Sequence, residues 1–238
     1  MEIWAHRGAS ADFPENTLEA FQGAVDQGAD GVELDVMRCA SGELVVCHDE
    51  SLERLAHLPW QVAQTRWWKL KRADVGAHRG MPARLPLLEE VLSLVPFSMR
   101  VNVELKCDTL DDRGLAVEVA ACLRARGERE RIIVSSFNPF CLVRFAAAAP
   151  HIERGWLIDP DKAYWPQAHL WLPLLRPAAV HPFHGQATPE RVAGWQAQGR
   201  AVNVWTVDDP DVARDLRGLG VAAVITNRPG ALRAELRR

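Results

Sequence analysis

Short β-branched segments alternate with helix-compatible segments along the whole chain, and this alternation constrains the fold more than any other feature. Eight such pairs fit into 238 residues, which is roughly 30 residues per pair. Because β-α-β connections are right-handed, eight units predict one closed α/β domain over residues 1–238, a (β/α)8 TIM barrel. An open doubly wound sheet is the alternative. The predicted strands are Glu2–His6, Gly31–Val36, Arg100–Lys106, Arg131–Ser136, Arg154–Ile158, Ala178–Pro182, Ala201–Thr206 and Val221–Thr226.

The expected helices follow the strands and begin at residues that suit a helix N-terminus. Asn, Asp and Pro are common at that position. Asn16 with Glu19 fits a capping box, and Gly28 is placed to end the same helix. The expected starts lie near Asn16, Pro86, Asp112, Asn138, Lys162, Pro189, Pro210 and Pro229.

Two segments depart from the repeat near the second strand. Leu44–His48 is strand-like but follows too closely for a parallel crossover, so we expect a hairpin. A turn centred between Ser41 and Gly42 would place Asp35 opposite His48. The next segment, Asp49–Leu85, is polar and irregular, and we interpret it as an insertion that forms a lid over one end of the barrel.

The segment Tyr164–Pro173 is unusual because it holds two Trp and two Pro. A helix packed on the barrel is the simplest interpretation. A contact between subunits or a wall of the substrate site is the alternative.

Composition excludes several classes of protein. Apolar residues make up 48% of the chain and the net charge is −3, so neither disorder nor nucleic-acid binding is indicated. No apolar run reaches the roughly 18 residues of a membrane span, and an acid follows Met1 where a signal peptide carries basic residues. The five cysteines lack a CxxC motif, so we expect reduced thiols and a cytoplasmic protein.

Carboxylates gather on two predicted strands. Glu33 and Asp35 are two residues apart and point to one face, and Glu104 with Lys106 repeats this spacing on the next barrel strand. Carboxylates this close repel one another unless a cation lies between them. Oxygen ligands favour Mg²⁺, Ca²⁺ or Mn²⁺ over zinc. The alternative is that these are solvent-facing residues paired with Arg.

Groups suited to a phosphodiester lie at the ends of the same strands. Arg7 and Lys106 would bind phosphate oxygens, and Gly8 would allow close approach of a ligand. His6 and His48 would act as general base and general acid, because imidazole exchanges protons near neutral pH. The alternative for each histidine is a structural role.

Phe137 and Trp205 follow strand ends where they would form a wall of the substrate site. Packing in the core is the alternative for both. His181 is similarly placed, but its spacing assigns it no role.

Taken in order, the motifs of this chain resemble those of the glycerophosphodiester phosphodiesterase family. The resemblance extends over nearly the whole chain. It rests on His6-Arg-Gly-Ala, Pro14-Glu-Asn-Thr, Gly28-Ala-Asp-Gly-Val-Glu-Leu-Asp-Val36, Val45-Val-Cys-His-Asp49, Leu52-Glu-Arg54, Leu85-Pro-Leu-Leu-Glu-Glu90, Val103-Glu-Leu-Lys106, Ser135-Ser-Phe137, Val204-Trp-Thr-Val207 and Ile225-Thr-Asn-Arg-Pro229.

The resemblance implies a metal-dependent hydrolase that releases glycerol 3-phosphate and an alcohol from glycerophosphocholine or glycerophosphoethanolamine. It implies that Asp49–Leu85 is a short form of the family's insertion. The hairpin turn departs from the family's usual pattern, with Cys39-Ala-Ser-Gly in place of Thr-Lys-Asp-Gly. The residues that match the family's metal ligands are Glu33, Asp35 and Glu104, its acid–base pair His6 and His48, and its phosphate contacts Arg7 and Lys106.

Other functions fit the same residues. The substrate could instead be a lysophospholipid or glycerophosphoinositol. A barrel that binds a phosphodiester without turnover belongs to another class, and the histidine pair argues against it because binding needs no proton transfer. The partner expected in each case is a small molecule, and the chain would be a monomer or a homodimer.

Overall fold

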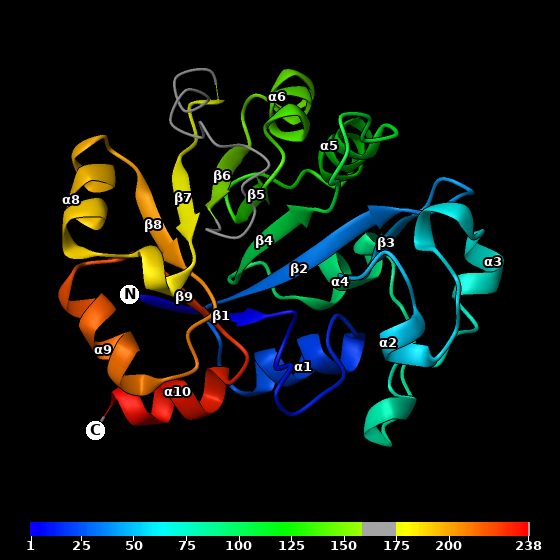
Figure 1. The fold of residues 1–238 in the computed structure, drawn as a ribbon, viewed down its shortest axis with the longest axis horizontal. Helices are drawn as coiled ribbons and strands as arrows, with labels where there is room; N and C mark the ends of the chain where they lie inside the picture. Colours follow the sequence, from blue (N-terminus) through cyan, green and yellow to red (C-terminus); the bar gives the residue numbers. More distant parts are fainter. Residues whose placement is uncertain (159–174, 238) are drawn as a thin grey trace.

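The computed structural model describes residues 1–158 and 175–237, and in this part of the chain nine strands form one sheet. Eight of them are parallel and close into a barrel, because β1 pairs with both β2 and β9 (Figure 1). The closed barrel is confirmed, and the open sheet is excluded. The strands are β1 Glu2–His6, β2 Gly31–Arg38, β3 Leu44–Val46, β4 Arg100–Leu105, β5 Ile132–Ser136, β6 Glu153–Ile158, β7 Ala179–Pro182, β8 Ala201–Val204 and β9 Ala223–Thr226.

The longer helices follow the strands and lie outside the ring (Figure 1). Three of them begin with proline after a side-chain cap, at Asn138, Thr188 and Asp209. The helix expected near Lys162 and the Tyr164–Pro173 segment lie outside the described residues. The helices are α1 Leu18–Asp26, α2 Glu53–Ala56, α3 Trp67–Leu70, α4 Leu88–Leu94, α5 Leu115–Ala125, α6 Pro139–Ala148, α8 Pro189–Ala197, α9 Pro210–Gly218 and α10 Pro229–Leu236.

The start of α1 differs from the expected capping box. Thr17 is the cap, and its hydroxyl accepts from the Ala20 amide at 3.2 Å. Asn16 instead adopts a left-handed conformation with φ +57°. Its side-chain amide donates to Asp35 Oδ2 at 2.8 Å. Asn16 therefore binds a carboxylate of the barrel interior and does not cap the helix.

The predicted hairpin is present, but its register is shifted by one residue. Val36 lies opposite Val46, and the Cys47 amide donates to the Asp35 carbonyl oxygen at 2.9 Å. Cys47 thus occupies the place expected for His48. The cause is a turn centred on Ser41 itself, in which Gly42 takes φ +107°, a conformation that favours glycine.

The polarity of the barrel interior changes along the barrel axis. Apolar side chains and Asn203 lie toward the amino ends of the strands, whereas Glu33, Asn102 and Glu104 are buried and line a cavity toward the carboxyl ends. In (β/α)8 barrels this carboxyl end carries the active site. The apolar cluster of the interior comprises Trp4, Ile133, Ala179, Ala223 and Ile225.

The insertion between β3 and α4 contains α2, α3 and two 3-10 turns, η1 Val62–Gln64 and η2 Ala77–Arg79. It lies beyond the arrowhead of β2 (Figure 1), and its apolar side chains form one hydrophobic cluster with the β2–β3 hairpin, in which Leu52 and Leu70 are fully buried. Arg79 fixes it to the β1–α1 loop by donating to the Ser10, Ala11 and Phe13 carbonyls. A third 3-10 turn, η3 His184–Gln186, follows β7. No helix among the described residues has the length and apolarity needed to cross a membrane.

Candidate active site

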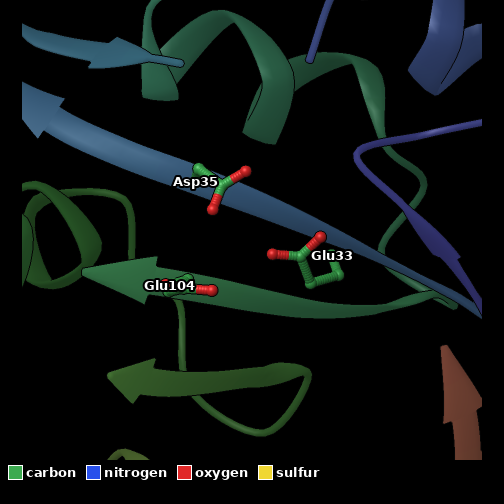
Figure 2. A group of neighbouring side chains, drawn as sticks. All are labelled: Glu33, Asp35 and Glu104. Atoms are coloured by element: carbon green, nitrogen blue, oxygen red, sulfur yellow. The ribbon is translucent and has the colours of Figure 1, made fainter. Parts of the chain in front are cut away.

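Three carboxylates meet inside the carboxyl end of the barrel. Glu33 and Asp35 project from β2 and Glu104 from the adjacent β4, and Figure 2 shows the three side chains turned toward one another. One oxygen from each lies within 4.8 Å of the others, and all three residues are buried. Glu33 and Asp35 are two residues apart on one strand and therefore face the same side, and Glu104 lies opposite Asp35 on the adjacent strand. The three side chains meet for this reason, as the sequence predicted.

The charges of this triad favour a bound cation. Burial raises the pKa of Glu33 well above its usual value, and the charges of Asp35 and Glu104 add to the effect. Burial would also raise the pKa of Asp35, but Lys106, Arg7, His48 and the hydrogen bond from Asn16 lower it to about 2. A hard divalent cation held by these oxygens would remove the repulsion at Glu33, so the residues present fit a Mg²⁺, Ca²⁺ or Mn²⁺ site.

Arg7 and Lys106 border the triad from two sides. Arg7 Nε is 3.3 Å from Asp35 Oδ2, and the Arg7 amide donates to Glu33 Oε2 at 3.0 Å. The backbone of Arg7 is left-handed, with φ +56°. Lys106 Nζ is 2.9 Å from Glu104 Oε1 and 3.7 Å from Asp35 Oδ1. Both cations are thus fixed beside the triad, where a phosphate would meet positive charge.

His6 is held in one tautomer by two residues from the far end of the chain. Asn227 Nδ2 donates to Asp208 Oδ2 at 2.6 Å, which fixes the amide so that Asn227 Oδ1 faces His6 Nδ1 at 2.7 Å. His6 Nδ1 therefore carries the proton, and Nε2 is left as an acceptor. Burial and the charge of Arg7 lower the pKa of His6 to about 4, so the ring is neutral at physiological pH.

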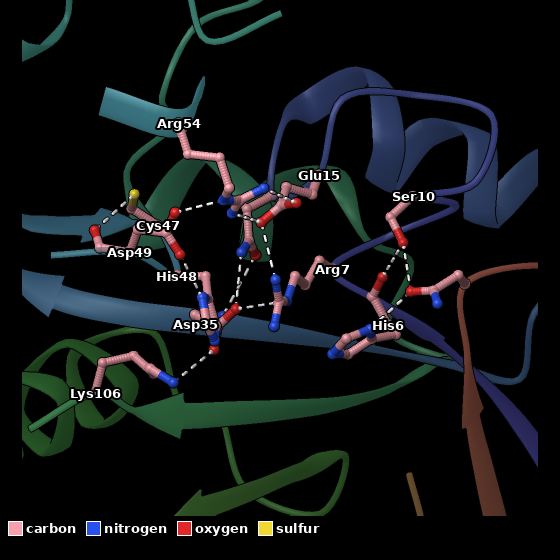
Figure 3. Close-up of polar contacts among 12 residues, drawn as sticks. His6, Arg7, Ser10, Glu15, Asp35, Cys47, His48, Asp49, Arg54 and Lys106 are labelled. Carbon is pink, nitrogen blue, oxygen red and sulfur yellow. Dashed lines mark hydrogen bonds and ion pairs between the residues drawn. The ribbon is translucent and has the colours of Figure 1, made fainter. Parts of the chain in front are cut away.

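His48 is held by a chain of charges that reaches into the insertion. Its Nδ1 lies 2.7 Å from Asp49 Oδ1, and Asp49 Oδ2 accepts from Arg54 Nε at 2.6 Å. Arg54 in turn pairs with Glu15, which also binds Arg7. Figure 3 shows His6 and His48 on either side of the Arg7 side chain. An imidazolium at His48 would have a carboxylate partner.

One cavity of about 120 Å³ is lined by the two histidines, Arg7, Lys106, Glu33 and Glu104. Phe137 and Trp205 form part of its apolar wall, with ring centroids 5.7 Å apart in an edge-to-face contact. The Trp205 indole donates to the His181 carbonyl oxygen at 2.8 Å. A wider groove of about 510 Å³ adjoins the cavity and shares two residues with it, His48 and Lys106.

The structure brings together the predicted metal ligands, histidines, phosphate-binding cations and aromatic wall residues. Apart from Asp35, which contacts Arg7 and Lys106, all of these line the cavity. Gly8 differs from expectation, because a Cβ there would lie 2.5 Å from the Ala20 carbonyl carbon, so this glycine permits helix packing. Other members of the site stand in the sequence motifs without a predicted role in the site: Glu15, Asn16, Asp49, Arg54 and Asn227. Of these, Asn16 was expected only as a helix cap.

The closed parallel barrel, with histidine, carboxylate and cationic side chains at the carboxyl ends of its strands, defines a (β/α)8-barrel enzyme. The sequence model of the glycerophosphoryl diester phosphodiesterase family matches residues 6–231. The chain belongs to this family, whose members are phosphoric diester hydrolases.

Individual relatives agree with this assignment over their full length. A glycerophosphodiester phosphodiesterase of Caldanaerobacter subterraneus is 34% identical over 97% of this chain and 95% of the relative. Among solved structures, an Oleispira antarctica phosphodiesterase in complex with the product sn-glycerol-3-phosphate has 29% identity and a TM-score of 0.87, covering 100% of this chain and 97% of that chain. A Thermotoga maritima glycerophosphodiester phosphodiesterase has 28% identity and a TM-score of 0.80, covering 100% and 98%.

Proposed function

We propose that this enzyme hydrolyses glycerophosphodiesters such as glycerophosphocholine and glycerophosphoethanolamine to glycerol 3-phosphate and an alcohol. The observation that carries the proposal is that two histidines, two cations and two carboxylates of the triad line one cavity, with the third carboxylate, Asp35, beside them. The product complex of the Oleispira antarctica relative supports glycerol 3-phosphate as the product.

Glu33, Asp35 and Glu104 would hold one divalent cation, Mg²⁺, Ca²⁺ or Mn²⁺. Bound there, the cation would polarise the phosphate and neutralise charge that develops on its oxygens. Arg7 and Lys106 bind the remaining phosphate oxygens and orient the diester. Their pairing with the triad supports this role, since both side chains are fixed before a substrate arrives.

His6 is the general base and His48 the general acid. His6 Nε2 accepts the proton of the attacking oxygen, which belongs to water or to the glycerol hydroxyl next to the phosphate. His48 donates a proton to the alcohol oxygen as its bond to phosphorus breaks. The neutral state and fixed tautomer of His6 support the first role, and the Asp49 partner of His48 supports the second. Phe137 and Trp205 line the substrate site.

The proposal includes the surroundings of the site. Residues 1–238 act as one catalytic domain, and residues 49–85 form a small lid beside it, supported by the contacts of Arg54 with Glu15. The protein works in the cytoplasm on a small-molecule substrate, as a monomer or homodimer. The five free cysteines support a reducing compartment.

The test is release of glycerol 3-phosphate from glycerophosphocholine by the purified protein, first with EDTA and then with each divalent ion restored. Turnover that disappears with EDTA and returns with an ion is the expected result. Glycerophosphoinositol and lysophosphatidylcholine are assayed in parallel. A higher rate on either one than on glycerophosphocholine would identify that diester as the preferred substrate. Absence of turnover on all diesters, in folded protein, would contradict the proposal.

A further inference from the structure

Asn102 is a buried polar residue inside the candidate site that the proposed chemistry does not use. It lies on β4 beside Glu33 of β2 and two residues before Glu104, so its side chain shares the inward face with the triad. Only 1% of its surface is exposed. Neither Oδ1 nor Nδ2 has a hydrogen-bond partner among the described residues, although Asn102 lines the 120 Å³ cavity.

An amide in this state destabilises the fold, because burial removes it from water without replacing its hydrogen bonds. Asn203 lies nearer the amino ends of the strands and differs from Asn102 in two ways. Its Nδ2 contacts His181 Nε2 at 3.0 Å, so only its Oδ1 lacks a partner in the described part of the chain, and it lines a different pocket with Trp4 and Arg100. Asn102 therefore retains both a donor and an acceptor for a ligand that enters its cavity.

The 120 Å³ cavity and the adjoining 510 Å³ groove indicate how a bound diester would be oriented. Lys106 and His48 border both the 120 Å³ cavity and the 510 Å³ groove, whereas His6 and Asn102 border only the cavity. A phosphate bound by Lys106 therefore sits at the boundary, with one substituent on each side. The alcohol protonated by His48 leaves toward the groove, and the other substituent occupies the cavity.

We propose that Asn102 recognises the hydroxyl groups of the glycerol moiety, which occupies the 120 Å³ cavity. This proposal rests on the proposed function. A glycerol hydroxyl both donates and accepts, so it matches an amide that offers Nδ2 as donor and Oδ1 as acceptor. The apolar wall of Phe137, Leu157, Trp205 and Ile225 then faces the carbon chain. Asn102 is thereby a specificity-determining residue for glycerol.

The test compares sn-glycerol 3-phosphate with n-propyl phosphate, which has the same carbon chain without hydroxyls. Binding of each is measured by calorimetry with Mg²⁺ present, for wild type, Asn102→Ala, Asn102→Leu and the control Asn203→Ala. We expect the Asn102 variants to bind glycerol 3-phosphate roughly tenfold more weakly, since one lost hydrogen bond of this strength changes Kd by about that factor. Binding of n-propyl phosphate should stay within about twofold.

Two outcomes would overturn the proposal. Equal losses for both phosphates would mean that Asn102 supports the cation or the site as a whole, and unchanged binding of glycerol 3-phosphate would mean that it contacts no hydroxyl. If Asn102→Leu does not fold, Asn102→Ala and Asn102→Ser carry the comparison. Wild-type turnover of glycerophosphocholine is measured separately, so an active enzyme whose Asn102 variants do not discriminate rejects this proposal alone, and an inactive enzyme rejects the proposed function.

Discussion

Arg54 and Glu15 form a bidentate ion pair, with Nη1 2.9 Å from Oε2 and Nη2 2.7 Å from Oε1. The pair joins the insertion to the loop before α1. Glu15 also accepts from Arg7, and Arg54 donates to Asp49, the partner of His48. One guanidinium of the insertion is thus linked to a proposed phosphate-binding residue and to a proposed acid.

Replacing Arg54 with alanine should lower kcat/KM by about 10- to 100-fold, because small displacements of Arg7 and His48 are costly for catalysis. The Tm should change little, since about half of the Arg54 side chain is exposed and such pairs add little stability. The control is Arg100→Ala, which breaks a pair with Glu153 at 2.6 Å remote from the candidate site. Equal losses of activity in both variants would contradict a specific role of Arg54 in positioning Arg7 and His48.

Asp208→Asn should lower kcat by about tenfold, because the Asn227 amide is then free to flip and present Nδ2 to His6. His6→Ala should lose about 100-fold or more. Steady-state rates are measured at saturating metal, with circular dichroism to verify the fold. An Asp208→Asn enzyme with unchanged kcat would mean that this carboxylate does not set the tautomer of His6.

Glu33→Gln should abolish turnover but leave the metal-free protein at least as stable as wild type, because it removes one of three buried, mutually repelling charges. The increase in Tm that Mg²⁺, Ca²⁺ or Mn²⁺ gives the wild type should also shrink. Thermal unfolding with EDTA and with each ion measures both effects. A Glu33→Gln protein that keeps the full metal-dependent shift would exclude Glu33 as a ligand.

His181 should make the protein sensitive to mild acid. Burial lowers the pKa of His181 to about 3, whereas the unfolded chain has a value of about 6.5. Below pH 6.5 the unfolded state binds more protons than the folded state. The contribution of His181 to the free energy of unfolding is therefore fully present above pH 6.5 and is lost as the pH falls toward 3. Urea unfolding measures how far the free energy of unfolding decreases between pH 7 and pH 5, and this decrease should be smaller by about 2 kcal/mol in His181→Gln than in the wild type. Replacement of the exposed His151 should leave the decrease as it is in the wild type.

The strands and the triad were predictable because both depend on local periodicity. Glu33, Asp35 and Glu104 follow the alternation of a strand, and eight repeats imply closure. The hairpin register was not predictable to one residue, because it depends on whether the turn centres on Ser41 or between two residues. The partners Asp208 and Asn227 also required the folded chain, since a long-range hydrogen bond leaves no spacing in the sequence.

The contact between His6 and Asn227 joins residues 221 positions apart. A ribosome that adds about 5–20 residues per second makes the second residue roughly 10–45 s after the first. During that interval the histidine has no partner to fix its ring, and β9 is not yet present to close the barrel beside β1. The site therefore becomes competent only after β9 and Asn227 have been made, and a nascent chain that lacks them carries the proposed base without the means to orient it.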